Sequence, residues 1–184
     1  MKSMWRKLLI VLLVITVFGL SACTDPTVDD VSIELREGVD TIEIGSEYED
    51  PGAKAKAYGF IITHDVVSNN VNTSIIGVYE IHYSVTYHEI TKSIKRIVTV
   101  VDTTKPIATL KAGIDTVSLN GTWVDAGITV NDNSGIRPSI IISGSVNTSM
   151  VGEYVITYSI YDESGNTTEL TRYVNVVLQT GNMN

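Results

Sequence analysis

The sequence predicts an all-β protein, with two tandem antiparallel β-sandwich domains behind an N-terminal export signal. A repeat with a period of about 75 residues predicts two copies of one domain. Strict alternation of apolar and polar residues within each copy predicts half-buried strands. Gly, Thr, Val, Ile, Ser and Asn dominate the composition, which favours strands and turns, and no apolar stripe of helical length follows the signal.

The first 22 residues have the three parts of a secretory signal. Residues 1–7 carry three positive charges before any acid, residues 8–18 form an apolar run, and small residues precede Cys23. The apolar run is shorter than the roughly 20 apolar residues that span a membrane, and polar sequence follows it at once. We therefore expect residues 1–22 to be a cleaved signal peptide.

Leu20-Ser21-Ala22-Cys23 resembles the lipobox of bacterial lipoproteins. The resemblance implies cleavage behind Ala22, a diacylglyceryl thioether on Cys23, and an extracytoplasmic protein held by palmitate-type chains to the outer face of the cytoplasmic membrane. Cys23 is the only cysteine, so it has no disulfide partner within the chain. Two or three acyl chains anchor stably, because each buried methylene contributes about 0.8 kcal/mol. The alternative is an ordinary signal peptide with an incidental cysteine.

The formal net charge of −8 excludes one class of partner. Loss of residues 1–22 removes three basic residues and no acids, so the mature chain carries −11. A protein this acidic is not expected to bind nucleic acid through its phosphates. Solubility is the simplest explanation of the charge.

The repeat is visible as four motifs that return 75 positions later along the chain. The offset changes by one residue only near the end, where Arg96 corresponds to Arg172. A constant offset over this span indicates two copies of one domain. The matching motifs are Leu35-x-x-Gly38-Val39-Asp40-Thr41 with Leu110-x-x-Gly113-Ile114-Asp115-Thr116, Asp50-Pro51-Gly52 with Asp125-Ala126-Gly127, Val71-Asn72-Thr73-Ser74 with Val146-Asn147-Thr148-Ser149, and Gly77-Val78-Tyr79-Glu80-Ile81-His82-Tyr83-Ser84 with Gly152-Glu153-Tyr154-Val155-Ile156-Thr157-Tyr158-Ser159.

The copies define the expected organisation of the chain. Residues 23–30 are the lipidated cysteine with a short acidic tether, residues 31–102 the first domain, and residues 103–105 the linker. Residues 106–178 are the second domain, and residues 179–184 a polar tail.

Each copy contains a strand with one apolar face. Residues 162–166 are expected to form a turn, and residues 170–177 the strand that returns beside it. Tyrosines on the apolar face are more typical of a core than of a sugar-stacking platform. The inward-facing residues are Tyr79, Ile81, Tyr83 and Val85 in the first copy, and Tyr154, Ile156, Tyr158 and Ile160 in the second.

The motifs together resemble a bacterial surface immunoglobulin-like (Ig-like) repeat. This repeat is also found in a pesticidal crystal protein and in many Gram-positive and mollicute surface proteins. The second copy matches nearly throughout, whereas residues 87–91 of the first copy replace the expected Asp-x-Ser-Gly-Asn hairpin. The resemblance implies two Ig-like β-sandwiches outside the cell. Because the family is a module, the fold by itself does not assign a function.

No catalytic constellation is apparent, and we do not expect an enzyme. His82 and His88 lie about 20 Å apart along an extended strand, so they cannot share a metal ion, and there is no second cysteine for a zinc site. His64-Asp65 has no serine in a nucleophile-elbow setting, so a surface loop is the better interpretation.

One acidic group near the domain junction is a candidate calcium site, and no other cofactor is expected. If the strands of the second copy alternate in direction, Asp132 and the hairpin holding Asp162 and Asn166 meet at the end that faces the first copy. Asp102 approaches the same place from the linker. Calcium prefers several oxygen ligands, so these side chains could hold it. The alternative is a set of Asx turns without an ion.

Three classes of function remain at this stage. The first is a surface binding or adhesion module, which presents Asn120-Gly121 and residues 143–152 to a protein or glycan. The second is a structural spacer or an accessory subunit of an envelope complex. The third, an enzyme or a solute-binding lipoprotein, is disfavoured, because the chain is too short and too rich in β-structure for two α/β lobes.

Overall fold

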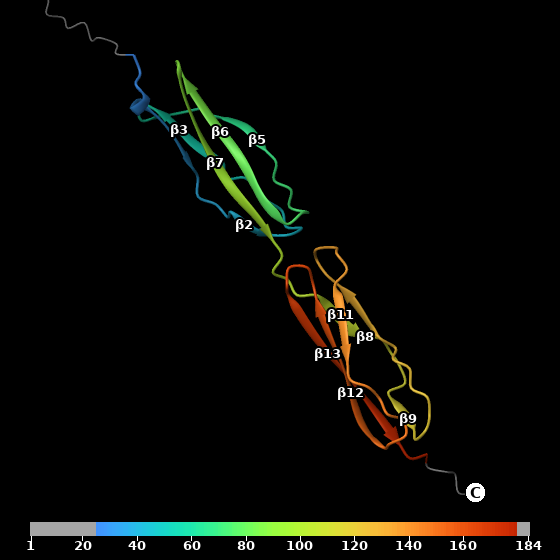
Figure 1. Ribbon diagram of the computed structural model, residues 1–184. Coiled ribbons are helices and arrows are strands. Elements are labelled where there is room, and N and C mark those ends of the chain that lie inside the picture. Colours follow the sequence, from blue (N-terminus) through green and yellow to red (C-terminus); the bar gives the residue numbers. More distant parts are fainter. Residues whose placement is uncertain (1–24, 180–184) are drawn as a thin grey trace, which may run out of the picture.

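The computed structural model describes residues 25–179, which form two β-sandwiches arranged end to end (Figure 1). The lipobox residues Leu20, Ser21, Ala22 and Cys23 lie outside the described residues. The predicted all-β class is confirmed. Within residues 25–179 the single helical element is a 3₁₀ turn, η1 (Val28–Asp30), and no helix there is long and apolar enough to cross a membrane.

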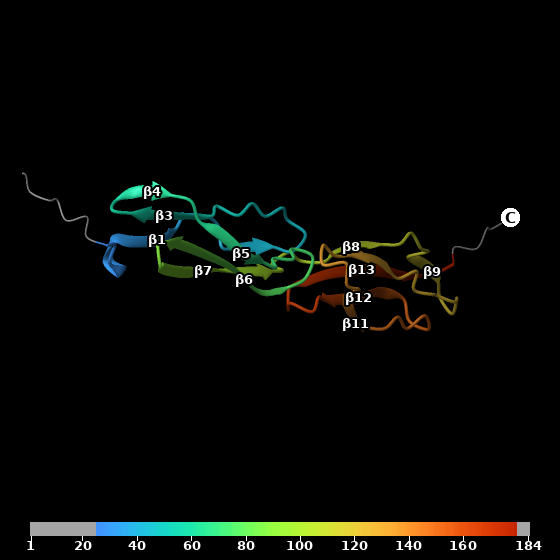
Figure 2. The ribbon, with the colours of Figure 1, turned by 90° about the horizontal axis from the view of Figure 1, so that it is seen from above.

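The first sandwich consists of a three-stranded and a four-stranded sheet, which lie on opposite sides of the domain in Figure 2. The smaller sheet has the order β1-β3-β4, and its strands are antiparallel. The larger sheet has the order β2-β7-β6-β5. The strands are β1 (Val31–Leu35), β2 (Thr41–Glu43), β3 (Ala53–Ala57), β4 (Phe60–Ile62), β5 (Asp65–Asn69), β6 (Gly77–Tyr87) and β7 (Ile90–Val101).

The second sandwich repeats this plan without a counterpart of β4. One sheet pairs β10 with β8, and the other has the order β11-β12-β13-β9. The strands are β8 (Ile107–Leu110), β9 (Thr116–Ser118), β10 (Ile128–Asn131), β11 (Ser139–Ser143), β12 (Gly152–Tyr161) and β13 (Thr167–Val177).

The β3–β4 connection explains why only one domain has the extra strand. It consists of Tyr58 and Gly59, both with positive φ (49° and 81°), as a tight two-residue hairpin turn requires. In the second domain the chain leaves β10 into a wider loop, in which Gly135 N donates to Asp132 O (3.3 Å). This loop lies at the domain junction.

In each domain, the chain passes from its first strand, in one sheet, to its second strand, in the other sheet, and a glycine lies at this crossing. β1 runs antiparallel to β3, whereas β2 runs parallel to β7 in the opposite sheet. At the crossing, a Cβ on Gly38 would lie 2.1 Å from Pro51 Cγ, and one on Gly113 would lie 2.8 Å from Ala126 Cβ. The repeated Leu-x-x-Gly motif therefore keeps space for the repeated Asp-x-Gly motif.

The turns of the two long hairpins differ in length, which explains why the offset between the copies changes by one residue near the end. In the first domain Tyr87 pairs with Ile90, so only two residues connect β6 to β7. In the second domain Tyr161 pairs with Thr167, which leaves a longer loop between β12 and β13. Asp162 N donates to Asn166 O across this loop (3.2 Å). The predicted turn at 162–166 and its returning strand are thus present.

Both cores form along the alternating strands. The buried residues include Ile81, Tyr83 and Val85 on β6, and Ile156, Tyr158 and Ile160 on β12, while Tyr79 and Tyr154 are partly buried. These are the apolar faces predicted from the alternation, because successive side chains of a strand point to opposite sides of its sheet.

A buried arginine sits in the first core. Arg96 on β7 is 1% exposed. Its Nη1 donates to Asp40 Oδ1 (2.6 Å), and its Nη2 donates to the carbonyl oxygens of Arg36 (2.5 Å) and Gly52 (3.2 Å). Buried charge is tolerated when it is paired and hydrogen-bonded in this way.

The second core repeats the arrangement with Arg172 on β13, also 1% exposed. Its Nη1 donates to both carboxylate oxygens of Asp115 (2.9 and 3.0 Å). Its Nη2 donates to the carbonyl oxygens of Lys111 (2.8 Å) and Gly127 (3.0 Å). In each domain, the repeated Leu-x-x-Gly-x-Asp and Asp-x-Gly motifs therefore supply oxygen atoms that bind the buried guanidinium.

Candidate functional site

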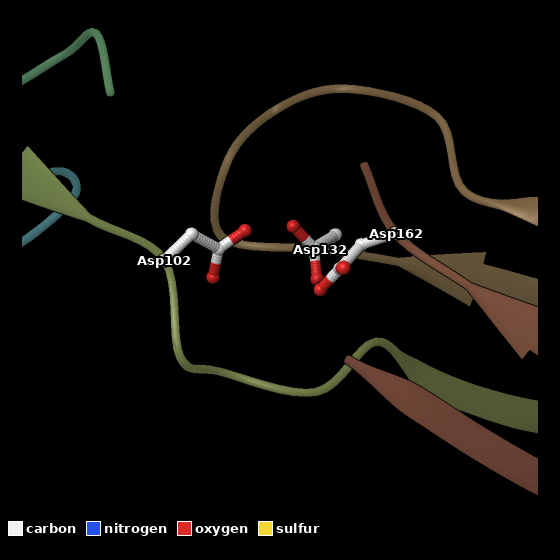
Figure 3. Close-up of side chains that lie close together, drawn as sticks. All are labelled: Asp102, Asp132 and Asp162. Atoms are coloured by element: carbon white, nitrogen blue, oxygen red, sulfur yellow. The ribbon is translucent and has the colours of Figure 1, made fainter. Parts of the chain in front are cut away.

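Three carboxylates meet at the junction between the domains. Asp102 follows β7 at the start of the linker, Asp132 follows β10, and Asp162 follows β12. Figure 3 shows their side chains pointing toward one another from three separate segments. One oxygen of each carboxylate lies within 4.8 Å of the others. We call these three residues the junction cluster.

The junction cluster is shielded from water. Asp102 and Asp132 are each 7% exposed, and Asp162 is partly buried. Asp132 Oδ1 accepts from the backbone N (3.0 Å) and the hydroxyl (2.5 Å) of Ser134. Asp132 Oδ2 is buried without any hydrogen-bond partner. Loop hydrogen bonds thus hold one oxygen of Asp132 and leave the other unused.

Neighbouring donors fix the other two carboxylates. Asp102 Oδ1 accepts from Thr104 N (3.2 Å), and Asp102 Oδ2 accepts from Ser164 Oγ (3.3 Å). Asn166 Nδ2 donates to Asp162 Oδ2 (2.8 Å) and to the backbone oxygen of Asp102 (3.1 Å). Asn166, expected as a fourth oxygen ligand, therefore joins the linker to the hairpin through its amide nitrogen.

The electrostatics of the junction cluster are unbalanced. Within residues 25–179 no ion pair involves Asp102, Asp132 or Asp162. Burial raises the pKa of Asp102 above its usual range, and the charges of Asp132 and Asp162 add to this shift, although a hydrogen bond from Thr104 opposes it. Three carboxylates are therefore held together at a place where the charge of Asp102 is disfavoured.

A second contact across the junction centres on Glu43 at the end of β2. Its carboxylate accepts from the backbone N and the hydroxyl of Thr103, and from the same two groups of Thr104, at 2.7–3.1 Å. Asn133 Nδ2, from the second domain, donates to Glu43 Oε1 (3.0 Å). These bonds, led by that from the Thr104 side chain, lower the pKa of Glu43 to about 2. We call this contact the linker clamp.

The sequence analysis missed Glu43, and the repeat could not have indicated it. The corresponding residue of the second copy is Ser118, and no third domain follows there in the described chain. The contact joins residues 60 or more positions apart, so it depends on how the linker folds back over β2.

The first domain provides an internal comparison for the junction cluster. An offset of 75 places Thr27, Ala57 and Tyr87 where the second domain has Asp102, Asp132 and Asp162. Ala57 is buried, at 3% exposure. The cluster is therefore an addition to the repeated fold and not a part of it.

The histidines do not form a site. His82 Nε2 lies 2.9 Å from Glu80 Oε2, His64 packs edge-on to Tyr83, and His88 lies in the β6–β7 turn. A polar hollow beside His88 is lined by Asp25, Pro26, Glu89 and Ile90, where the described chain begins.

The loops that were expected to present a binding surface lie together at the far end of the second domain. Asn120 N donates to Thr148 O (2.7 Å), which joins the loop after β9 to the loop before β12. Met150 and Val151 in this second loop are 62% and 54% exposed. Figure 1 places this end away from the first domain, beside the C-terminus.

Three solved structures match this chain with low similarity. A lipoprotein from Bacteroides thetaiotaomicron is 18% identical, with a TM-score of 0.34 over 82% of this chain and 81% of that chain. The M60 catalytic domain with the CBM51-1 and CBM51-2 domains of Clostridium perfringens ZmpB is 14% identical, with a TM-score of 0.37 over 83% and 31%. The protocadherin γB4 extracellular domain is 7% identical, with a TM-score of 0.35 over 80% and 26%. No function is transferred from these proteins.

The family comparison covers both domains. No curated protein matches the chain. The model of the family described as bacterial surface protein, Ig-like domain, matches residues 36–100 and again residues 111–176. Both matches fall on the β-sandwiches, which confirms the two tandem repeats. The chain therefore belongs to the bacterial surface protein Ig-like domain family and carries two copies of its domain.

Proposed function

We propose that this chain is a lipid-anchored, non-catalytic surface protein whose second Ig-like domain binds another protein outside the cell. Membership of a bacterial surface family supports the location. The binding proposal depends on one observation, the exposed apolar loop at the far end of the second domain. There Met150 and Val151 face solvent, and the Asn120–Thr148 bond holds their loop in place.

A protein ligand fits this loop better than a glycan. Sugar-binding surfaces use exposed aromatic rings for stacking, whereas Met150 and Val151 are aliphatic. Tyr83 and Tyr158 are fully buried in the cores, and the exposed Tyr173 lies on β13 and not in this loop. Exposed methionine is instead typical of adaptable protein-binding surfaces. A glycan therefore remains the second candidate for the ligand.

The full-length protein in liposomes, applied to arrays of purified extracellular proteins and glycans, tests this proposal. We expect Met150→Asp to abolish binding, because it places a charge in the apolar contact. Ile75→Asp is the matched control, since Ile75 occupies the same position in the first copy, at the end that faces the junction. Absence of any bound array member, or equal loss with both variants, would contradict the proposal.

The anchoring rests on Cys23 and is tested separately. We expect Cys23→Ser to abolish labelling by a palmitate analogue and to release the protein from the membrane or leave it unprocessed. Retained labelling in this variant would overturn the anchor while leaving the binding proposal intact.

A structural spacer or an accessory subunit of an envelope complex is the second candidate function. The linker clamp favours it, because Glu43 binds Thr103, Thr104 and Asn133 and so holds the two domains in line. Crosslinking in cells separates the two candidates. One constant membrane-protein partner, unaffected by Met150→Asp, supports the spacer.

A further inference from the structure

We propose that the junction cluster of Asp102, Asp132 and Asp162 binds one calcium ion, which fastens the linker to the second domain. This site is independent of the ligand-binding loop in the proposed function, since it lies at the opposite end of the second domain.

The spacing of the carboxylates suits calcium. Calcium takes oxygen ligands at about 2.3–2.6 Å, so two ligands on opposite sides of one ion lie up to about 5 Å apart. One oxygen from each aspartate lies within 4.8 Å of the others, which allows all three to contact one ion. Magnesium demands near-ideal octahedral geometry and usually keeps several waters, so it is less often held by protein carboxylates alone.

A second observation points to a ligand within the cluster. Asp132 is 93% buried, and its Oδ2 has no hydrogen-bond partner, although its Oδ1 has two from Ser134. Buried polar atoms are almost always satisfied, because leaving one unpaired costs the full desolvation of that atom. Asp132 Oδ2 is therefore free to bind a cation, at a place that bulk water reaches poorly.

The charge of the cluster also favours a cation. Three carboxylates lie together, two of them buried, and no basic side chain of residues 25–179 pairs with any of them. Hydrogen bonds from Thr104, Ser134 and Asn166 orient these carboxylates, but these donors are neutral. A divalent cation offsets the repulsion that the fold otherwise has to withstand.

The chemistry of the donors identifies the kind of metal. The group contains only carboxylate oxygens, without histidine or cysteine, and such hard ligands select calcium or magnesium over zinc. Extracellular calcium modules of this kind bind with dissociation constants on the order of 0.1–1 mM.

The first domain supports the assignment as an internal comparison. Its corresponding residues are Thr27, Ala57 and Tyr87, none of them charged, and Ala57 is buried. The same position in the first domain is thus filled by an uncharged side chain. Asp132 therefore places a carboxylate where the first domain has a buried methyl group, and it does so beside Asp102 of the linker.

Calcium titration of the full-length protein, purified in detergent and stripped with chelator, tests the proposal. Isothermal titration calorimetry with calcium chloride is expected to show one site. Calcium at about ten times the dissociation constant is expected to raise the Tm of the second domain by about 6–11 °C. Intrinsic fluorescence of Trp123, which packs on the second core, reports this transition. Absence of both heat and Tm shift overturns the site, and an equal response to magnesium chloride overturns the choice of calcium.

Two variants and a matched control make the test specific. Asp132→Asn and Asp162→Asn are each expected to weaken calcium binding at least tenfold. Asp65→Asn removes one exposed carboxylate of β5 and is expected to bind like the wild type. Binding that survives in both cluster variants, or is lost equally in the control, overturns the assignment.

Discussion

Among residues 25–179, Arg96 and Arg172 are the largest fully buried side chains, and each organises the start of its domain. Their guanidinium groups only donate hydrogen bonds, so their partners are oxygens: carbonyl and carboxylate oxygens of loops and, for Arg172 Nε, the Tyr158 hydroxyl (3.3 Å). The phenols join the same networks: Tyr83 OH donates to Asp50 Oδ1, and Tyr158 OH donates to Asp125 Oδ1, both at 2.6 Å. The invariance of these residues between the copies therefore reflects structure.

Replacing Arg172 with methionine tests this interpretation. Arg172→Met keeps the apolar stem but leaves the carbonyls of Lys111 and Gly127 without a donor. We expect it to lower the free energy of unfolding by about 3 kcal/mol, measured by denaturant unfolding. Arg137→Met, at an exposed position, is the control and is expected to change little. Comparable effects of the two substitutions would show that the network contributes no stability.

Tyr83 makes the first domain sensitive to alkali. Burial, helped by the hydrogen bond to Asp50, raises the pKa of Tyr83 to about 12, against about 10 for an unfolded chain. A raised pKa means that its stabilising contribution is complete below about pH 10 and is lost as the pH rises toward 12. We expect Tyr83→Phe to reduce the loss of stability between these pH values, measured by unfolding at several pH values. An unchanged pH profile in this variant would disprove the prediction.

At the scale of elements, each domain depends on the point where the chain passes from its first strand, in one sheet, to its second strand, in the other sheet. The chain passes from β8 to β9 at a point where Gly113 faces Ala126 with no room for a side chain. Protein interiors are closely packed, so an added methyl group has to displace its neighbours.

Gly113→Ala is expected to destabilise the second domain by about 1–3 kcal/mol, because its Cβ would lie 2.8 Å from Ala126 Cβ. Adding Ala126→Gly removes the facing methyl group and should recover part of this loss, although Arg172 Nη1 also lies 3.2 Å away. Thermal unfolding of both single variants and the double variant measures the coupling. Strictly additive effects would indicate that these two positions do not contact each other.

At the scale of the whole molecule, two features hold the domains in line. The junction cluster joins Asp102 of the linker to the second domain, and the linker clamp joins Glu43 of the first domain to Asn133 of the second. The linker is short, and both its threonines donate to Glu43, so its conformation is set by these contacts.

The linker clamp is expected to open in acid. The pKa of Glu43 is lowered to about 2, so the clamp contributes fully above the ordinary value of about 4.5 and is lost as the pH falls through 2. Carboxyl titration by nuclear magnetic resonance should locate this transition near pH 2. Glu43→Gln should widen the range of interdomain angles at neutral pH, seen by small-angle scattering. Glu34→Gln, an exposed control, should leave both readouts unchanged. A Glu43 titration near pH 4.5 would show that the clamp is not formed.

The sequence predicted the class, the two repeats and the buried strand faces, because these follow from local spacing. It also placed Asp102, Asp132 and Asp162 at one junction, since alternating strands bring their ends to the same side of a sandwich. It could not predict that Asp132 Oδ2 is buried without a partner, because desolvation depends on which atoms cover it.

Asn166 and Glu43 show the same difference between what the sequence predicts and what only the structure shows. Sequence position brought Asn166 to the cluster, but only the structure shows its amide nitrogen bound to Asp162 and to the backbone of Asp102. Glu43 has no counterpart at Ser118, so no repeat indicated it.

What the sequence by itself determined about this protein is its two-copy β architecture, since periodicity and repetition are properties of neighbouring residues. The tertiary structure alone decided the buried arginine networks, the linker clamp and the unpaired oxygen of the junction cluster. The physical reason is that each of these depends on contacts between residues far apart in the chain, and on the exclusion of water that packing produces.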